Sequence, residues 1–356
     1  MNNKKLFESA TLGKMKLKNR IVMAPLTRSR AINNIPNDLM AEYYSARAGA
    51  GLIITEGTSP SPNGLGYARI PGLFNQDQVQ GWKKVTSAVH KNEGHIFVQL
   101  MHTGRVSHSA NMPSQSKILS ASATQAPGKM WTDAKGEQEH PVSSEMTIAE
   151  IKSTVQEYAQ SAKLAIEAGF DGVELHGANG YLIEQFLNPG TNKRSDAYGG
   201  SNQNRMRFVL EIAEAVVNAV GGDRVGIRLS PYGVFNGSEI FEGVDEFYGE
   251  LAQKLSDLKL LYIHVVDHSA IGAPAVNPEV KRLIRENFKG SYILSGGYDS
   301  GRAERDLTER KGDFVAFGRA FISNPDLVIK LKQSLPLRDP DPSTFYTPGP
   351  KGYTDY

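Results

Sequence analysis

The sequence predicts a (β/α)8 barrel that forms a single domain over residues 1–356. Eight apolar runs of strand length recur along the chain, separated by amphipathic stretches of helix length. The runs are continuously apolar rather than alternating, as expected of parallel strands that are buried on both faces. A length of 356 residues suits such a barrel with insertions. A doubly wound open sheet is the alternative, and the lack of a GxGxxG motif after the first run speaks against it.

The predicted strands and helices follow one another in regular order. The eight strand runs are Arg20–Pro25, Gly51–Glu56, His95–Leu100, Gly169–His176, Arg224–Ser230, Leu261–Asp267, Ser291–Gly296 and Asp313–Gly318. The clearest helix is predicted over Thr147–Ala168, because Thr147 and Glu150 have the spacing of a capping box and Gly169 suits the position after a helix. A second helix is predicted over Asn204–Val220, where two glycines follow.

One segment interrupts this order. His102–Glu145 is long, polar and rich in Ser, Ala, Gly and Pro. Loops of this length in a compact domain are usually functional, so we expect an excursion at the rim after the third strand, containing a hairpin and covering the site. The tail from Leu335 onwards is rich in Pro, Asp and Gly.

Composition excludes several classes of function. A net charge of +2 gives no reason to expect a nucleic acid or a membrane surface as partner. The chain has no cysteine, which excludes disulfides, thiolate catalysis and cysteine-based metal sites and fits a cytoplasmic protein. The polar segment Met1–Phe7 has no apolar region behind it, and no run is long enough for a transmembrane helix. No HExxH or comparable motif predicts a metal site.

Glycines and a basic residue follow the last two predicted strands. Loops after strands 7 and 8 of such barrels commonly bind phosphate. Gly296 and Gly297 would let backbone N–H groups approach an anion, and Arg319 could add a positive charge. The alternative is that the glycines only shape a tight turn and Arg319 lies on the surface.

Polar residues also end the middle strands. Arg228 lies between apolar neighbours in the fifth strand, so it either forms a salt bridge inside the barrel, with Glu56 or Glu174, or stabilises negative charge on a cofactor. His176, Asn179 and Tyr181 leave the end of the fourth strand together. Each alone could be a packing residue, but a neutral phenol beside two hydrogen-bonding groups suits chemistry that needs one proton.

The same residues lie in motifs of a known family. The chain resembles the old yellow enzymes, and within them the bacterial branch of N-ethylmaleimide and pentaerythritol tetranitrate reductases. The resemblance begins at LFESATLGKMKLKNRIVMAPLTRSRA and continues through EYYSARAGAGLIITEGT and FVQLMHTGR. Its most specific part is AGFDGVELHGANGYLIEQFLNPGTNKRSDAYGGSNQNRMRF, and RVGIRLSP, DFVAFGRAFISNPDL and GYTDY complete it.

The resemblance implies a flavoenzyme, with FMN bound tightly but not covalently. It implies ping-pong reduction of activated C=C bonds in small unsaturated carbonyl or nitro compounds, with NADPH or NADH as transient reductant and a monomer or homodimer as the assembly. His176 and Asn179 would bind an electron-withdrawing oxygen of the substrate, and Tyr181 would donate the proton. The residues implied to hold FMN are Pro25, Leu26, Thr27, Gly57, Gln99, Arg228, Gly297, Gly318 and Arg319.

The resemblance further implies that Tyr67, Met101 and Tyr353 line the substrate pocket. Many relatives have Trp where this chain has Met101, so we expect a roomier pocket with altered facial selectivity. Relatives usually continue a few residues beyond Tyr356. Reduction of nitrate esters or nitroaromatics on the same site is an alternative reaction, and a barrel that binds flavin or a phosphorylated ligand without turnover is a third hypothesis.

Overall fold

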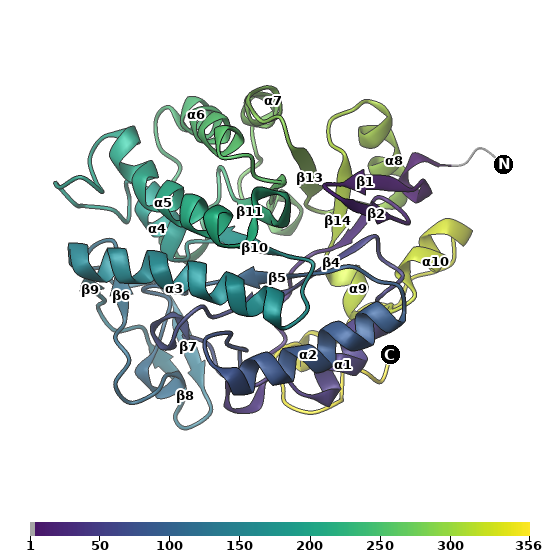
Figure 1. Ribbon diagram of the computed structural model, residues 1–356, viewed down its shortest axis with the longest axis horizontal. Coiled ribbons are helices and arrows are strands. Elements are labelled where there is room, and N and C mark those ends of the chain that lie inside the picture. The colour runs from purple at the N-terminus through teal and green to yellow at the C-terminus, as the bar shows by residue number, and fades with distance from the viewer. Residues whose placement is uncertain (1–3) are drawn as a thin grey trace.

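A computed structural model describes residues 4–356, so the first three residues of the polar segment Met1–Phe7 lie outside it. Within the described residues, eight parallel strands close a barrel in the order β3, β4, β5, β10, β11, β12, β13 and β14, with β14 pairing back to β3 (Figure 1). The strands are Ile21–Met23, Leu52–Thr58, Ile96–Leu100, Gly172–Gly177, Val225–Leu229, Tyr262–Val265, Ser291–Ser295 and Phe314–Phe317. Each lies within or overlaps one of the eight predicted runs, so the predicted (β/α)8 barrel is confirmed.

Alternate residues of each strand point into and out of the barrel. Val22, Leu52 and Phe97 belong to the inner apolar cluster, whereas their neighbours pack outward against the helices. The inner cluster also contains Leu12 and Leu17 from an antiparallel hairpin, β1 (Ala10–Leu12) and β2 (Met15–Leu17). This hairpin therefore closes the N-terminal end of the barrel and leaves the opposite end for the site.

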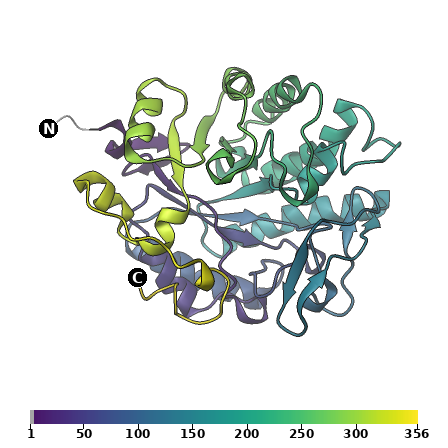
Figure 2. The same cartoon turned by 180° about the vertical axis from the view of Figure 1, so that it is seen from behind.

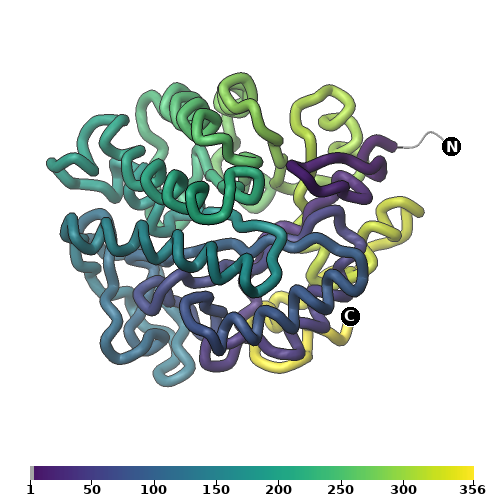
Figure 3. Tube along the Cα trace, viewed as in Figure 1, coloured from purple at the N-terminus to yellow at the C-terminus, as the bar shows by residue number. Residues whose placement is uncertain are grey.

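Helices surround the barrel, as the tube in Figure 3 shows. The capping box predicted for the Thr147–Ala168 helix is present at the start of α3, whereas α5 begins at Asn202, two residues before its predicted start, because the Ser201 hydroxyl caps it. No helix within residues 4–356 is long and apolar enough to cross a membrane. The helices are α1 Asp38–Ser45, α2 Gln76–Lys91, α3 Ile148–Glu167, α4 Leu182–Leu187, α5 Asn202–Val220, α6 Val244–Asp257, α7 Pro278–Asn287, α8 Ser300–Thr308, α9 Arg319–Ser323 and α10 Leu327–Gln333.

The excursion after the third barrel strand contains the expected hairpin. Its strands β7 (Lys129–Thr132) and β8 (Gly136–Glu139) pair antiparallel, and two further short strands, β6 (Leu119–Ser120) and β9 (Ser144–Glu145), pair in parallel. Val106 and Met130 of the excursion pack against Tyr67 and Tyr181. The excursion thus covers one side of the C-terminal end of the barrel, as predicted.

The C-terminal segment is bound along the first strand–helix loop, beside α1 (Figure 2). Arg28 and Arg30, both almost completely buried, donate hydrogen bonds to backbone carbonyls of residues 344–352. Tyr353 stacks on Tyr43 with ring centroids 4.0 Å apart and lies under the guanidinium of Arg30. These contacts order the tail and fix which of its aromatic residues reach the site.

Candidate active site

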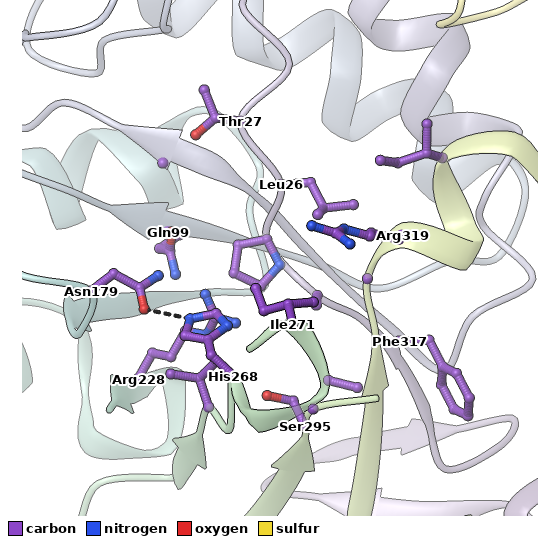
Figure 4. Close-up of a pocket in the computed structure, with 18 of the residues that line it drawn as sticks. Leu26, Thr27, Gln99, Asn179, Arg228, His268, Ile271, Ser295, Phe317 and Arg319 are labelled. Atoms are coloured by element: carbon purple, nitrogen blue, oxygen red, sulfur yellow. Dashed lines mark hydrogen bonds between the residues drawn. The ribbon is translucent and has the colours of Figure 1, made fainter. Parts of the chain in front are cut away.

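A cavity of about 580 Å³ lies at the C-terminal ends of the barrel strands. The close-up in Figure 4 shows side chains from several different strands and loops converging on it. The structure brings almost all of the residues nominated from the sequence to this one cavity. Those that line it are Pro25, Leu26, Thr27, Gly57, Gln99, Met101, His176, Asn179, Tyr181, Arg228, Gly297, Gly318 and Arg319.

Arg228 is a buried cation without a protein partner in the described residues. Its side chain forms no hydrogen bond or ion pair within residues 4–356, and its Nε atom is buried and unsatisfied. A salt bridge to Glu56 or Glu174 was one of the two interpretations of Arg228 from the sequence, and within residues 4–356 neither salt bridge is formed. Burial lowers the pKa of Arg228, with the carboxylate of Glu174 opposing that effect. A buried guanidinium facing a cavity needs an electron-rich partner, and a ligand can supply it.

Glu174 forms a hydrogen bond with Gln99 rather than a salt bridge with Arg228. The amide nitrogen of Gln99 donates to Glu174 Oε1 over 2.8 Å, while Tyr262 and His264 contact Oε2 at 3.1 and 3.0 Å. Because the Gln99 nitrogen is engaged, its oxygen remains as a hydrogen-bond acceptor. The barrel interior thus presents an acceptor from Gln99 and a cation from Arg228 at the same cavity.

The loops after β13 and β14 leave room for a ligand. Gly297 has a φ of +61°, and a Cβ there would lie 2.4 Å from Cβ of Ala270, so any other residue would be both strained and crowded. Arg319 is exposed, and its side chain extends towards Leu26 at the cavity (Figure 4). The glycines and the cation thus lie together, as a phosphate site requires.

His176 lies opposite Arg228 in the pairing of β10 with β11. Burial, followed by the charge of Arg228, holds the pKa of His176 well below its usual range, so the imidazole is neutral at neutral pH. Its Nδ1 atom is buried without a hydrogen-bond partner in residues 4–356. Asn179 adopts a left-handed φ of +60° two residues after β10 and also faces the cavity.

Tyr181 immediately precedes α4 and lies edge to face with His176, with ring centroids 5.0 Å apart. Burial raises the pKa of Tyr181 to about 12, so its phenol stays protonated at neutral pH. The hydroxyl of Tyr67 lies 3.0 Å from the hydroxyl of Tyr181. Tyr67 therefore contacts a cavity residue, although it is not among the cavity-lining residues itself.

The prediction that Tyr353 lines the substrate pocket is wrong. Its ring is completely buried between Tyr43 and the guanidinium groups of Arg28 and Arg30. The aromatic tail residues that line the cavity are Phe345 and Tyr346. Sequence reasoning also missed His268, whose Nε2 lies 2.9 Å from Asn179 Oδ1 (Figure 4). His268 follows β12 by three residues, in a loop without periodicity, so no pattern at the strand end marks it in the sequence.

Residues 5–338 match the sequence profile of the NADH:flavin oxidoreductase / NADH oxidase family. The chain belongs to this family. It is 38% identical to 12-oxophytodienoate reductase 7 of Oryza sativa subsp. japonica, over 99% of this chain and 94% of that protein. It is 40% identical to a probable flavin mononucleotide-dependent alkene reductase of Leishmania infantum, over 97% and 95% of the two chains.

Solved structures of the family superimpose closely on this member. Morphinone reductase gives a TM-score of 0.95 at 42% identity, covering 100% of this chain and 96% of the other. An old yellow enzyme homologue from Zymomonas mobilis also gives a TM-score of 0.95, at 39% identity and 99% coverage of both chains. The old yellow enzyme resemblance is confirmed, and with it a flavin-dependent oxidoreductase that uses a nicotinamide nucleotide.

Proposed function

We propose that this old yellow enzyme is an FMN-dependent ene reductase that reduces activated C=C bonds of unsaturated carbonyl or nitro compounds with NADPH or NADH. The observation that carries the proposal is that neutral hydrogen-bonding side chains and a buried cation line the same cavity. The neutral His176, Asn179 and the protonated phenol of Tyr181 lie beside Arg228, an unpartnered cation within residues 4–356. The names of relatives as alkene, 12-oxophytodienoate and morphinone reductases support the same reaction class.

The cavity residues fit FMN bound without a covalent link. Arg228 would hold the flavin ring by offering its charge to an electron-rich part of it, and the oxygen of Gln99 would accept a hydrogen bond from a ring N–H. The open loop at Gly297, with Gly318 and Arg319 beside it, suits the phosphate. The ring would border Pro25, Leu26, Thr27 and Gly57. When bound, FMN supplies a two-electron carrier between nicotinamide and alkene.

His176 and Asn179 polarise the substrate. Hydrogen bonds from both side chains to one carbonyl or nitro oxygen draw electron density away from the conjugated double bond, which makes its β-carbon electrophilic. Two donors on one oxygen also orient the substrate, so that its α-carbon faces Tyr181. Burial around the cavity keeps these hydrogen bonds strong, because little water competes for the donors.

Tyr181 supplies the proton to the α-carbon. A phenol with a pKa of about 12 holds its proton until a strongly basic centre develops beside it. The hydrogen bond with Tyr67 orients the Tyr181 hydroxyl, and Met101 borders the same part of the cavity. Nicotinamide and substrate use this cavity in turn, which gives ping-pong kinetics.

Reduction of nitrate esters or nitroaromatic compounds is a second candidate reaction at the same site. His176 and Asn179 present donors that suit the oxygens of a nitrate ester or nitroaromatic compound as well as a carbonyl oxygen. Release of nitrite separates this reaction from alkene reduction. A single domain, a monomeric or homodimeric assembly and a cytoplasmic location stay predictions from the sequence.

Anaerobic stopped-flow spectroscopy of the purified protein tests the proposal. The yellow protein should be bleached by NADPH or NADH, and the ratio of the two rates defines the preferred nucleotide. Mixing the reduced protein with cyclohex-2-enone, a maleimide or a nitrate ester should restore the flavin absorbance for at least one of them. A colourless protein that cannot be reconstituted with FMN would refute the proposal.

A further inference from the structure

Hydrogen bonds hold the backbone and the side-chain oxygen of Asn179. Its backbone N–H donates to the hydroxyl of Ser230 over 2.9 Å, and its carbonyl accepts from the side chain of Asn236 over 2.8 Å. Its side-chain oxygen lies 2.9 Å from Nε2 of His268. With the backbone fixed at a left-handed φ, only the side chain could still turn, and the contact with His268 restrains it.

The contact with His268 has a defined direction. An amide oxygen is only an acceptor, so His268 Nε2 must carry the proton and donate it. Burial, followed by the charge of Arg228, lowers the pKa of His268 to about 4, so at neutral pH the ring is neutral and has one N–H to give. With its oxygen bound to His268, the NH2 group of Asn179 is the part that remains for a ligand (Figure 4).

We propose that His268 is a positioning residue that fixes the Asn179 amide with its NH2 group towards the substrate, and thereby selects substrates that offer a hydrogen-bond acceptor. The inference rests on the proposed function. An unrestrained amide could turn over and present its oxygen, which would repel a carbonyl or nitro oxygen. Holding the NH2 group in place keeps Asn179 and His176 directed at the same acceptor.

The surroundings of His268 support this role. Phe235 packs edge to face against the ring, with centroids 4.5 Å apart, and so covers one side of it while Nε2 contacts Asn179. The neighbouring carboxylate of Asp267 is engaged by Lys281 at 2.6 Å and by the backbone N–H of Ser269 at 3.0 Å. Asp267 therefore has other partners and leaves the Nε2 proton of His268 to Asn179.

The test compares His268→Leu, which removes the donor, with His268→Gln, which keeps an N–H at the end of a flexible chain. Phe235→Leu is the matched control, because it alters packing at His268 and leaves both hydrogen-bonding groups. The flavin is reduced with dithionite, so that nicotinamide binding plays no part. Two quantities are measured: the Kd of the saturated ketone cyclohexanone, from the absorbance of the flavin before it is reduced, and the rate at which cyclohex-2-enone reoxidises the reduced flavin. Reoxidation by oxygen shows that the flavin site is intact.

Loss of one hydrogen bond of this kind predicts a Kd for cyclohexanone that is about tenfold higher in His268→Leu. His268→Gln should recover most of that loss, Phe235→Leu should bind within about threefold of the original protein, and oxygen should reoxidise all of them equally. An unchanged Kd in His268→Leu, or a His268→Gln protein as weak as His268→Leu, overturns the role of His268 alone. If the original protein neither binds cyclohexanone nor reacts with the enone, the proposed function fails as well.

Asn179→Asp gives a second measurement that does not require a change at His268. With one carboxylate oxygen bound to His268, the other would present an acceptor to the ligand. Its Kd for cyclohexanone should therefore exceed that of Asn179→Ala, in which no group faces the carbonyl. Binding by Asn179→Asp as tight as in the original protein would overturn the proposal.

Discussion

The hydroxyl oxygens of Tyr67 and Tyr181 lie 3.0 Å apart, and their rings meet edge to face. Tyr67 comes from the loop between β4 and α2, whereas Tyr181 immediately precedes α4. One hydrogen bond thus joins the loops that follow two different barrel strands, β4 and β10. It places the phenol assigned as proton donor in contact with a second phenol that can orient it.

Replacing Tyr181 by Phe should slow reoxidation of the reduced enzyme by cyclohex-2-enone about 100-fold or more, because the proton donor is lost. Reduction by NADPH or NADH should change little. Tyr67→Phe is the control, since it keeps the donor and removes only its orienting partner, and it should have a much smaller effect. Stopped-flow traces measure the two half-reactions in each variant. An unchanged rate of reoxidation by the enone in Tyr181→Phe would exclude its role as proton donor.

Gly297→Ala should weaken FMN binding about tenfold, because a side chain at this left-handed position strains the backbone and meets Ala270. Gly301→Ala is the control. Gly301 lies in α8 without a left-handed φ, and its added Cβ would make only one ordinary contact. Fluorescence titration of the apoprotein with FMN gives both Kd values, and equal affinities would contradict the phosphate assignment.

Met101→Trp should change the ratio of product enantiomers. The side chain of Met101 packs with Leu65 and Ile70 beside Tyr67 and Tyr181, so a rigid ring there would restrict how the substrate lies. Met112→Leu, at the edge of the same cluster, is the control. Chiral chromatography of the products from several substituted enones measures the ratio, and unchanged ratios throughout would show that residue 101 does not set facial selectivity.

Tyr353→Ala should destabilise the fold by about 3–5 kcal/mol, as expected when a buried aromatic ring is removed. Tyr353→Phe should be neutral or slightly stabilising, because the buried hydroxyl has no hydrogen-bond partner in the described residues. Tyr346→Ala should instead leave Tm nearly unchanged and alter KM for the enone. Thermal melts and steady-state kinetics distinguish the structural role of Tyr353 from the pocket role of Tyr346. A changed KM with an unchanged Tm in Tyr353→Ala would show that Tyr353 lines the pocket.

Glu184 should make stability depend on pH. Burial raises the pKa of Glu184 to about 7, although Ser230 and the N–H of Gly180 donate to its carboxylate. A raised pKa favours the folded state at low pH, and this contribution is lost as pH rises from the ordinary value near 4.5 through 7. The Tm of Glu184→Gln minus the Tm of the original protein should therefore increase from pH 5 to pH 8, because only the original protein loses this contribution. A Tm difference that is constant with pH would contradict the shifted pKa.

Sequence patterns predicted the barrel because each strand is buried on both faces and leaves a continuous apolar run. They also predicted residues at strand ends, such as Arg228 and Gly297, because parallel strands bring those ends to one face. His268 and Tyr353 were beyond such reasoning. The position of His268 depends on a loop conformation without periodicity. The choice between Tyr353 and Tyr346 depends on the buried arginines to which the tail binds, and these lie over 300 residues away in the sequence.

The binding of residues 344–353 to Arg28 and Arg30 affects how the enzyme matures during synthesis. The barrel strands leave the ribosome first, from β3 to β14, and can pair before the tail exists. The cavity wall formed by Phe345 and Tyr346 is added only after the barrel strands, when residues 344–353 emerge. Until then Arg28 and Arg30 lack the tail carbonyls that they bind, so a nascent barrel should hold its flavin less tightly than a barrel with the tail in place.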